Sequence, residues 1–104
     1  MPVEVMFTPC AVKDISDAVD YIADTLCDPS AAERQVTAII DKAALLAKFP
    51  EMGSLIETQT GFPTEYRRLL CGNYSVFYRF GGSTVRVIRV LHNRRDYIKI
   101  LFTD

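Results

Sequence analysis

Residues 66–92, YRRLLCGNYSVFYRFGGSTVRVIRVLH, decide the fold class because they contain three strand-like runs joined by two tight turns. The runs are rich in β-branched and aromatic residues and cover 66–71, 74–80 and 84–92. Gly72-Asn73 separates the first two runs and Gly81-Gly82-Ser83 separates the last two. Short connections of this composition are typical of β-hairpins. The segment therefore predicts three consecutive antiparallel strands.

Alternation along these runs predicts which side chains share a face of the sheet. In the middle run, one face holds Tyr74, Val76, Tyr78 and Phe80, and the other holds Ser75, Phe77 and Arg79. The last run has apolar residues on both faces, so we expect it to lie inside the sheet rather than at its rim. Alternation also places Arg67 and Arg68 on opposite faces, and it places His92 on the same face as Arg86.

The chain before residue 50 predicts a helical hairpin. Apolar residues recur every three or four positions in two segments, first at Val12, Ile15, Val19, Ile22 and Leu26 and then at Ala32, Val36, Ile39, Ala43 and Leu46. Such stripes are typical of amphipathic helices, and the short connection makes the two helices antiparallel neighbours. Thr8-Pro9 has the pattern of an N-cap and a first helical proline. Ser30–Glu33 has the spacing of a capping box, and Phe49-Pro50 is expected to end the second helix.

Three remaining segments complete the order of elements. Residues 3–7 predict a short strand, residues 50–65 predict a connecting loop, and residues 94–102 fit either one or two helical turns or a further extended segment. The order β-α-α-β-β-β predicts an α+β fold with the helical hairpin packed on one face of a curved, mainly antiparallel sheet. We expect a single domain over residues 1–104, since a chain of this length does not divide into two cores.

Composition excludes several classes of protein. The hydrophobic share of 49% and the charged share of 24% are those of an ordinary globular protein and not of a disordered chain. No apolar run reaches the ~18 residues of a membrane helix and the N-terminus lacks signal-peptide features, so we expect a cytoplasmic protein with no membrane partner. Cys10, Cys27 and Cys71 have no zinc-site spacing with the single histidine. We therefore expect reduced core thiols, no metal site and no cofactor.

The net charge of −1 conceals an uneven distribution. Residues 1–60 contain four basic and ten acidic side chains, whereas residues 61–104 contain eight basic and three acidic ones. Seven of those eight are arginines, whose planar fork suits phosphate and carboxylate groups. Two interpretations follow. Either the arginines gather on the sheet face left bare by the helices and bind an anionic partner, or the two halves neutralise each other across the fold.

Three stretches, together with the helical hairpin, resemble the RelE/ParE superfamily of toxins from bacterial type II toxin–antitoxin systems. They are AKFPEMGS (47–54), YRRLLCGNYSVFYRF (66–80) and VRVIRVLHNRRDY (85–97). The resemblance covers almost the whole chain. It implies a small growth inhibitor, of the kind linked to plasmid stabilization, that a cognate antitoxin protein neutralises. It also implies that this chain meets DNA only indirectly, through the antitoxin.

One activity of the superfamily is the RelE-like cleavage of messenger RNA on the ribosome. Attack by a 2′-hydroxyl group requires a proton acceptor, cations at the phosphate and a proton donor. The catalytic candidates are Arg68, at a position where RelE-like toxins place a cation, and His92, since imidazole titrates near pH ~6.5. Ser75 stands where RelE-like enzymes typically have arginine, and Tyr97 is displaced by two residues from their terminal tyrosine. These departures favour the second activity.

The second activity is ParE-like inhibition of DNA gyrase, which would make the chain a binding protein rather than an enzyme. ParE-like toxins commonly carry an L-H-x-R-x-D ending, and Leu91–Asp96 matches it residue by residue. The same motif also has a structural interpretation, with His92 bonded to Asp96 and Arg95 paired with a helix carboxylate. We favour the ParE-like function, keep mRNA cleavage as the alternative, and keep an inactive toxin-fold binding module as a third. The side chains expected to bind target or antitoxin are Arg67, Arg68, Arg79, Arg86, His92, Arg94, Arg95 and Tyr97.

Overall fold

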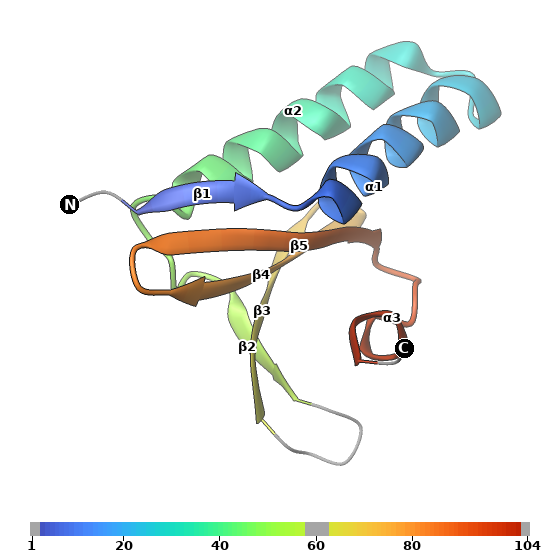
Figure 1. The fold of residues 1–104 in the computed structure, drawn as a ribbon. Helices are drawn as coiled ribbons and strands as arrows, with labels where there is room; N and C mark the ends of the chain where they lie inside the picture. The colour runs from blue at the N-terminus through green and yellow to red at the C-terminus, as the bar shows by residue number, and fades with distance from the viewer. Residues whose placement is uncertain (1–2, 58–62, 103–104) are drawn as a thin grey trace.

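The computed structural model describes residues 3–57 and 63–102, which form a five-stranded sheet with two long helices on one side (Figure 1). The elements in chain order are β1 (Glu4–Phe7), α1 (Pro9–Asp20), a π-helical turn η1 (Tyr21–Thr25), α2 (Pro29–Leu45), β2 (Ser54–Glu57), β3 (Pro63–Cys71), β4 (Tyr74–Gly81), β5 (Thr84–His92) and α3 (Tyr97–Phe102). The strands lie in the order β1-β5-β4-β3-β2, with β1 parallel to β5 and the other neighbours antiparallel. The predicted α+β fold is confirmed.

The three strands predicted from residues 66–92 form the middle of this sheet. β5 lies between β1 and β4, which confirms that it is an interior strand. Gly72 and Gly82 lie in the two hairpin turns with φ angles of 62° and 61°, a region that only glycine adopts readily. The lower ends of β2 and β3 diverge from β1 and β5, so the sheet is curved (Figure 1).

Both long helices begin with a proline in the first helical turn. Thr8 caps α1, as predicted. The predicted capping box of Ser30–Glu33 is wrong, because Asp28 caps α2 and its carboxylate accepts the Ala31 N–H at 3.0 Å. Pro29 favours this earlier start, since its missing N–H and fixed φ suit the first helical position.

The segment after α2 departs from its prediction. α2 ends at Leu45 rather than at Phe49, and hydrogen-bonded turns follow it. The predicted loop of residues 50–65 contains β2, and β3 begins within it at Pro63. The segment that contains β2 has no sustained period and is flanked by proline and glycine, so only its pairing with β3 reveals it as a strand. The part of the predicted loop over residues 58–62 lies outside the described residues.

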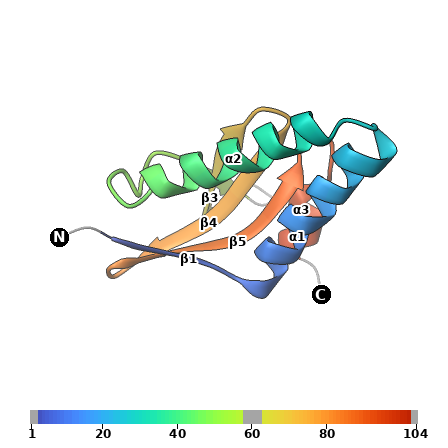
Figure 2. The ribbon, with the colours of Figure 1, turned by 90° about the horizontal axis from the view of Figure 1, so that it is seen from above.

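The sheet face that meets α1 and α2 carries the main core (Figure 2). The β4 side chains predicted for this face all belong to or pack against one buried cluster, namely Tyr74, Val76, Tyr78 and Phe80. Tyr78 also holds the chain that follows α2. Its hydroxyl donates to the Pro50 carbonyl and accepts the Gly53 N–H, both at 2.8 Å. The buried Tyr78 hydroxyl thus holds in place the segment that leads from α2 to β2.

A β-bulge interrupts β5. The register shifts between Phe77 and Tyr78 of β4, whose partners in β5 are Arg89 and Val87, so that Ile88 is an extra residue. A bulge of one residue reverses the face to which all later side chains of the strand point.

This reversal separates two predicted site residues. Arg86, before the bulge, lies opposite Arg79 on the sheet face away from the long helices. His92, after the bulge, lies opposite Tyr74, whose side chain belongs to the core on the helix side. The prediction that His92 shares a face with Arg86 is therefore wrong, because it assumed regular alternation.

The sheet face away from the long helices is not bare. A second apolar cluster of Ile56, Phe77 and Leu91 lies on it, and packed against that cluster are Tyr66, Tyr97, Ile100, Leu101 and Phe102. The last four belong to α3, so the tail left open between helix and strand is a helix that covers part of the sheet (Figure 1). Phe77 is only 1% exposed as a result. The expectation of a bare face is wrong over this region.

Candidate functional site

The predicted site residues fall into separate regions rather than one cationic surface. Arg68 and Tyr97 lie where α3 begins, and Arg79 and Arg86 lie side by side elsewhere on the same sheet face. His92, Arg94 and Arg95 lie at the end of β5, beside α1. The arginines therefore do not converge on a single phosphate-sized site.

Arg68 is held in place by a hydrogen bond and by an aromatic ring. Its Nε donates to Ser75 Oγ at 3.0 Å, and the Ser75 hydroxyl donates in turn to Asn93 Oδ1 at 2.6 Å. The guanidinium carbon of Arg68 lies 4.7 Å from the centroid of the Tyr97 ring, within the range of a cation–π contact. The other N–H groups of Arg68 form no hydrogen bond within the described residues, so a positioned cation is available to an anion.

Ser75 and Asn93 were not among the predicted site residues. Ser75 is buried, and Asn93 Nδ2 donates to the Gly72 carbonyl at 3.0 Å, which ties the end of β5 to the β3–β4 turn. Two signals in the sequence pointed to Ser75: alternation placed it on this sheet face, and it stands where RelE-like enzymes typically have arginine. Its contact with Asn93 depends on the pairing register, which no local pattern specifies.

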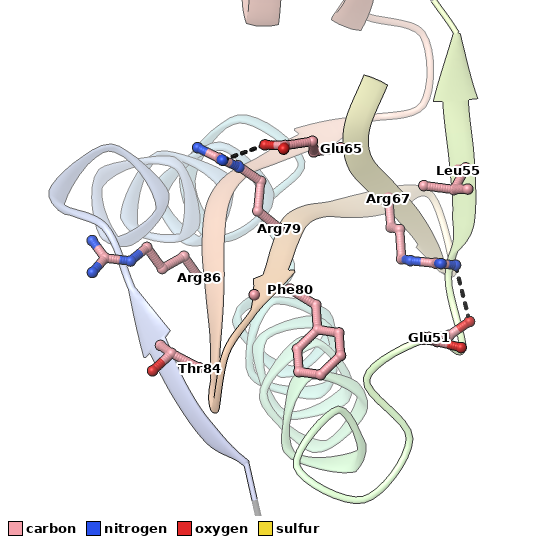
Figure 3. A pocket seen from close by; sticks show the side chains of 9 residues that line it. Glu51, Leu55, Glu65, Arg67, Arg79, Phe80, Thr84 and Arg86 are labelled. Carbon is pink, nitrogen blue, oxygen red and sulfur yellow. Dashed lines mark hydrogen bonds and ion pairs between the residues drawn. The ribbon is translucent and has the colours of Figure 1, made fainter. Parts of the chain in front are cut away.

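Arg79 and Arg86 are direct cross-strand partners on β4 and β5. Arg79 forms an ion pair with Glu65, and its guanidinium carbon lies 5.5 Å from the centroid of the Tyr66 ring. Arg86 is exposed and forms no hydrogen bond or ion pair within residues 3–57 and 63–102. In Figure 3 both arginines point away from Phe80, which faces the long helices.

A cleft of about 530 Å³ lies at this end of the sheet, where β4 continues beyond its last pair with β3. Its lining residues are Glu51, Leu55, Glu65, Arg67, Arg79, Phe80, Gly81, Thr84 and Arg86 (Figure 3). Cations, carboxylates and apolar side chains thus all reach this one region.

Arg67 contributes to the fold. Its Nη1 donates to the Gly53 carbonyl at 2.8 Å and to the Glu51 carbonyl at 3.2 Å, which fastens the turn after α2 to β3. Arg67 pairs with Tyr78 and Arg68 with Phe77, so the prediction that the two arginines point to opposite faces is confirmed.

Arg89, which was not a predicted site residue, forms the most buried ion pair of the described residues. Its Nε and Nη2 donate to the Asp14 carboxylate at 2.7 and 2.9 Å, and Asp14 also accepts the Val90 N–H at 3.0 Å. The hydrogen bond to Asp14 raises the pKa of the Arg89 guanidinium, and burial opposes that effect. This pair joins the acidic half of the chain to the basic half, as the second interpretation of the charge distribution required.

The contacts of His92 are with its own strand end and with a core residue. Its Nδ1 accepts the Arg94 N–H at 3.1 Å, and its ring lies edge-on to Tyr74 with 5.2 Å between centroids. The expected bond from His92 to Asp96 is not formed. Asp96 Oδ1 instead accepts the Lys99 N–H at 3.2 Å, at the start of α3.

Arg94 and Arg95 lie exposed on the turn that follows β5. They line a cavity of about 420 Å³ between α1 and the end of β5, together with Asp17 and Tyr21. The expected ion pair between Arg95 and a helix carboxylate is absent from the described part of the chain. Both guanidinium groups are thus available at the surface.

The cysteine prediction holds for one residue of three. Cys71 is buried, and burial raises the pKa of its thiol, whereas Cys10 and Cys27 are exposed. No group of three or more His, Cys, Asp or Glu side chains that could hold a metal ion is found among the described residues. Over those same residues, no helix is both long enough and apolar enough to cross a membrane.

The architecture is that of chains from type II toxin–antitoxin complexes. A chain of the chromosomal ParDE system from P. aeruginosa superposes with a TM-score of 0.70 at 18% identity, covering 86% of this chain and 95% of that one. A chain of the RelBE2 toxin–antitoxin complex from Mycobacterium tuberculosis gives a TM-score of 0.66 at 22% identity, with 89% and 100% covered. A chain of the RelB–RelE antitoxin–toxin complex from Methanococcus jannaschii gives 0.54 at 23% identity, with 88% and 94% covered.

The sequence assigns the family directly. Residues 5–97 match the family described as "ParE toxin of type II toxin-antitoxin system, parDE", and the chain therefore belongs to the ParE toxin family. No curated protein is a significant match to this chain.

Proposed function

We propose that this chain inhibits bacterial growth by binding DNA gyrase in the cytoplasm, without cleaving RNA, and that a cognate antitoxin neutralises it. The separation of the two catalytic candidates carries this proposal. Arg68 lies opposite Phe77 on the face that α3 covers, whereas His92 lies opposite Tyr74 on the other face. Cleavage through a 2′-hydroxyl group needs its acid, base and cations around one phosphate, and these two side chains cannot meet there.

The environment of His92 supports a structural role. The Nδ1 atom of His92 accepts the Arg94 N–H, and this bond holds the turn after β5 in shape. That turn presents Arg94 and Arg95, which we propose as contacts to the target. The antitoxin partner is supported by the structural relatives, which come from complexes of toxins with antitoxins.

A second candidate function is ribosome-dependent cleavage of messenger RNA. The observation that favours it is the contact of Arg68 with Tyr97, which places a cation beside a phenol at 4.7 Å. In such an enzyme the Arg68 guanidinium, held beside the Tyr97 ring, would stabilise the negative charge that develops on the phosphate. The gyrase inhibitor would therefore depend on Arg94 and Arg95, whereas the nuclease would depend on Arg68 and Tyr97.

Expression of the chain without its antitoxin tests both functions. We expect growth arrest, DNA breaks that depend on gyrase, and inhibition of purified gyrase in a supercoiling assay, with transcripts intact. The combined Arg94→Ala and Arg95→Ala variant should lose these effects, and Arg68→Ala should keep them. Codon-specific cuts on translating ribosomes that disappear in Arg68→Ala would instead establish the nuclease. Normal growth with folded protein present would identify an inactive binding module.

A further inference from the structure

The pairing of Arg79 with Arg86 is unfavourable within the isolated chain. The two residues are direct cross-strand partners, and like charges placed directly opposite one another in a sheet are destabilising. Glu65 compensates the charge of Arg79 but not that of Arg86, because it forms an ion pair with Arg79 alone. The Glu65 side chain is itself largely exposed. Arg86 has no partner in the part of the chain that the structure describes. The site therefore has one guanidinium group whose hydrogen-bonding capacity is unused.

The neighbours of this pair show what kind of anion fits. Across the four strands the same row contains Met6 on β1, Arg86 on β5, Arg79 on β4 and Tyr66 on β3. Met6 is 45% exposed, so an accessible apolar side chain lies next to the two arginines on the rim strand of the sheet. A ligand that crosses this row meets an apolar side chain, two adjacent guanidinium groups and an aromatic ring in succession.

Carboxylates of the chain flank the pair on both sides. Glu65 lies beside Arg79, and Glu4 lies two residues from Met6 on the same face of β1. A long polyanion would meet these carboxylates, and nucleic-acid binding ordinarily rests on many phosphate contacts rather than two. A single carboxylate between two guanidinium forks gains charge-assisted, bidentate hydrogen bonds without reaching either acidic residue. The row thus suits an acidic and apolar protein segment better than DNA or RNA.

We propose that Arg79 and Arg86, with Met6 and Tyr66 on either side, dock a carboxylate-bearing segment of the antitoxin. This inference rests on the proposed function only in naming the antitoxin as the partner. The segment places an Asp or Glu side chain between the two guanidinium groups and apolar side chains against Met6 and the half-buried Tyr66. Binding then relieves the cross-strand repulsion, so the free chain is poised for an acidic partner.

The test measures the affinity of the purified chain for its cognate antitoxin. Substituting both arginines, Arg79→Ala with Arg86→Ala, should weaken binding by about a hundred-fold or more, and Arg86→Ala alone by about ten-fold. Arg86→Lys retains the charge and loses the fork, so its affinity should fall between those of the wild type and Arg86→Ala. The control is Arg34→Ala, an exposed cation of α2, which should bind like the wild type. Both substituted side chains are exposed, so the thermal midpoint should stay within a few degrees of the wild type.

The outcomes separate this inference from the proposed function. Equal antitoxin affinity of the wild type and the double variant would overturn the inference, while growth arrest would still stand as evidence of a toxin. A single-stranded 20-nucleotide probe that binds the wild type and not the double variant would overturn it in favour of a phosphate ligand. A wild-type chain that neither arrests growth nor binds the antitoxin would refute the proposed function itself. Weakened antitoxin binding with growth arrest retained is the result that we expect.

Discussion

The ion pair between Asp14 and Arg89 predicts a large loss of stability when Asp14 is replaced by alanine. The Asp14 carboxylate accepts three hydrogen bonds, two from Arg89 and one from the Val90 N–H. These bonds join α1 to the bulged part of β5, and no other ion pair among the described residues links a long helix to the sheet. Asp14→Ala leaves a charged group and a backbone donor without an acceptor.

The magnitude follows from burial. The Asp14 side chain is 10% exposed and the Arg89 side chain 26%. Removing one member of a buried pair costs about 3–5 kcal/mol, mostly because the remaining charge is unpaired. Water reaches part of the Arg89 guanidinium, so we expect a loss of about 2–3 kcal/mol in the free energy of unfolding. In a domain of about 100 residues this lowers Tm by roughly 8–20 °C.

Asp17→Ala is the matched control on the same helix. Asp17 pairs with Lys13 at 3.0 Å, and both side chains are well exposed, so the loss should stay below about 0.5 kcal/mol. Urea unfolding followed by circular dichroism gives both values, and equal m-values ensure that they are comparable. A double-mutant cycle with Arg89→Ala isolates the energy of the pair. Equal losses in Asp14→Ala and Asp17→Ala would refute the argument from burial.

Three further predictions concern the core. Tyr78→Phe leaves the buried Gly53 N–H without its acceptor and should cost about 2 kcal/mol in urea unfolding, whereas Tyr97→Phe should cost under ~0.5 kcal/mol. Gly53→Ala should cost at least ~2 kcal/mol in the same assay, because its new Cβ would lie 2.8 Å from the Tyr78 ring and 2.9 Å from the Arg68 carbonyl oxygen. Burial raises the pKa of the Cys71 thiol above its ordinary 9.0, so the folded chain keeps a proton that the unfolded chain loses, and stability should fall as pH rises past 9.0. Cys71→Ala should fall less steeply in this range, and an identical pH profile would contradict the assignment.

Elements whose side chains meet a continuous surface could be predicted from the sequence. Most positions of the two helical stripes are buried or pack against the core, and the two-sided apolar pattern of β5 follows from its interior place in the sheet. Val12 and Leu26, at the two ends of the first stripe, are instead 56% and 55% exposed. The local signals at Thr8 and at the two hairpin turns also sufficed. The equally local signal of Ser30–Glu33 did not, because Asp28 and Pro29 start α2 earlier. β2 and α3 have no sequence periodicity that distinguishes them from other local structures, and both depend on partners distant in the sequence.

The bulge in β5 has a physical reason that local alternation conceals. Regular alternation would have placed Arg89 on the core face with Val85 and Val87. The extra residue, Ile88, moves Val90 into that position and sends Arg89 to Asp14. The strand with the bulge and the strand without it would each place a similar number of apolar side chains on the core face. The two arrangements differ in whether the Arg89 guanidinium lies in the core, which is costly. The separation of His92 from Arg86 is a consequence of that choice.

The charge asymmetry of the sequence therefore resolves into two kinds of arginine. Four arginines have intramolecular partners: Arg67 holds the turn after α2, Arg68 contacts the start of α3, Arg79 pairs with Glu65 near the start of β3, and Arg89 pairs with Asp14 of α1. Among the arginines after residue 60, the ones without a side-chain partner in the described chain are Arg86, Arg94 and Arg95. Arg86 lies on the outer sheet face, and the other two lie beside α1. Cations that remain available on separate surfaces suit a protein that contacts two macromolecules, whereas a nuclease requires them around one phosphate.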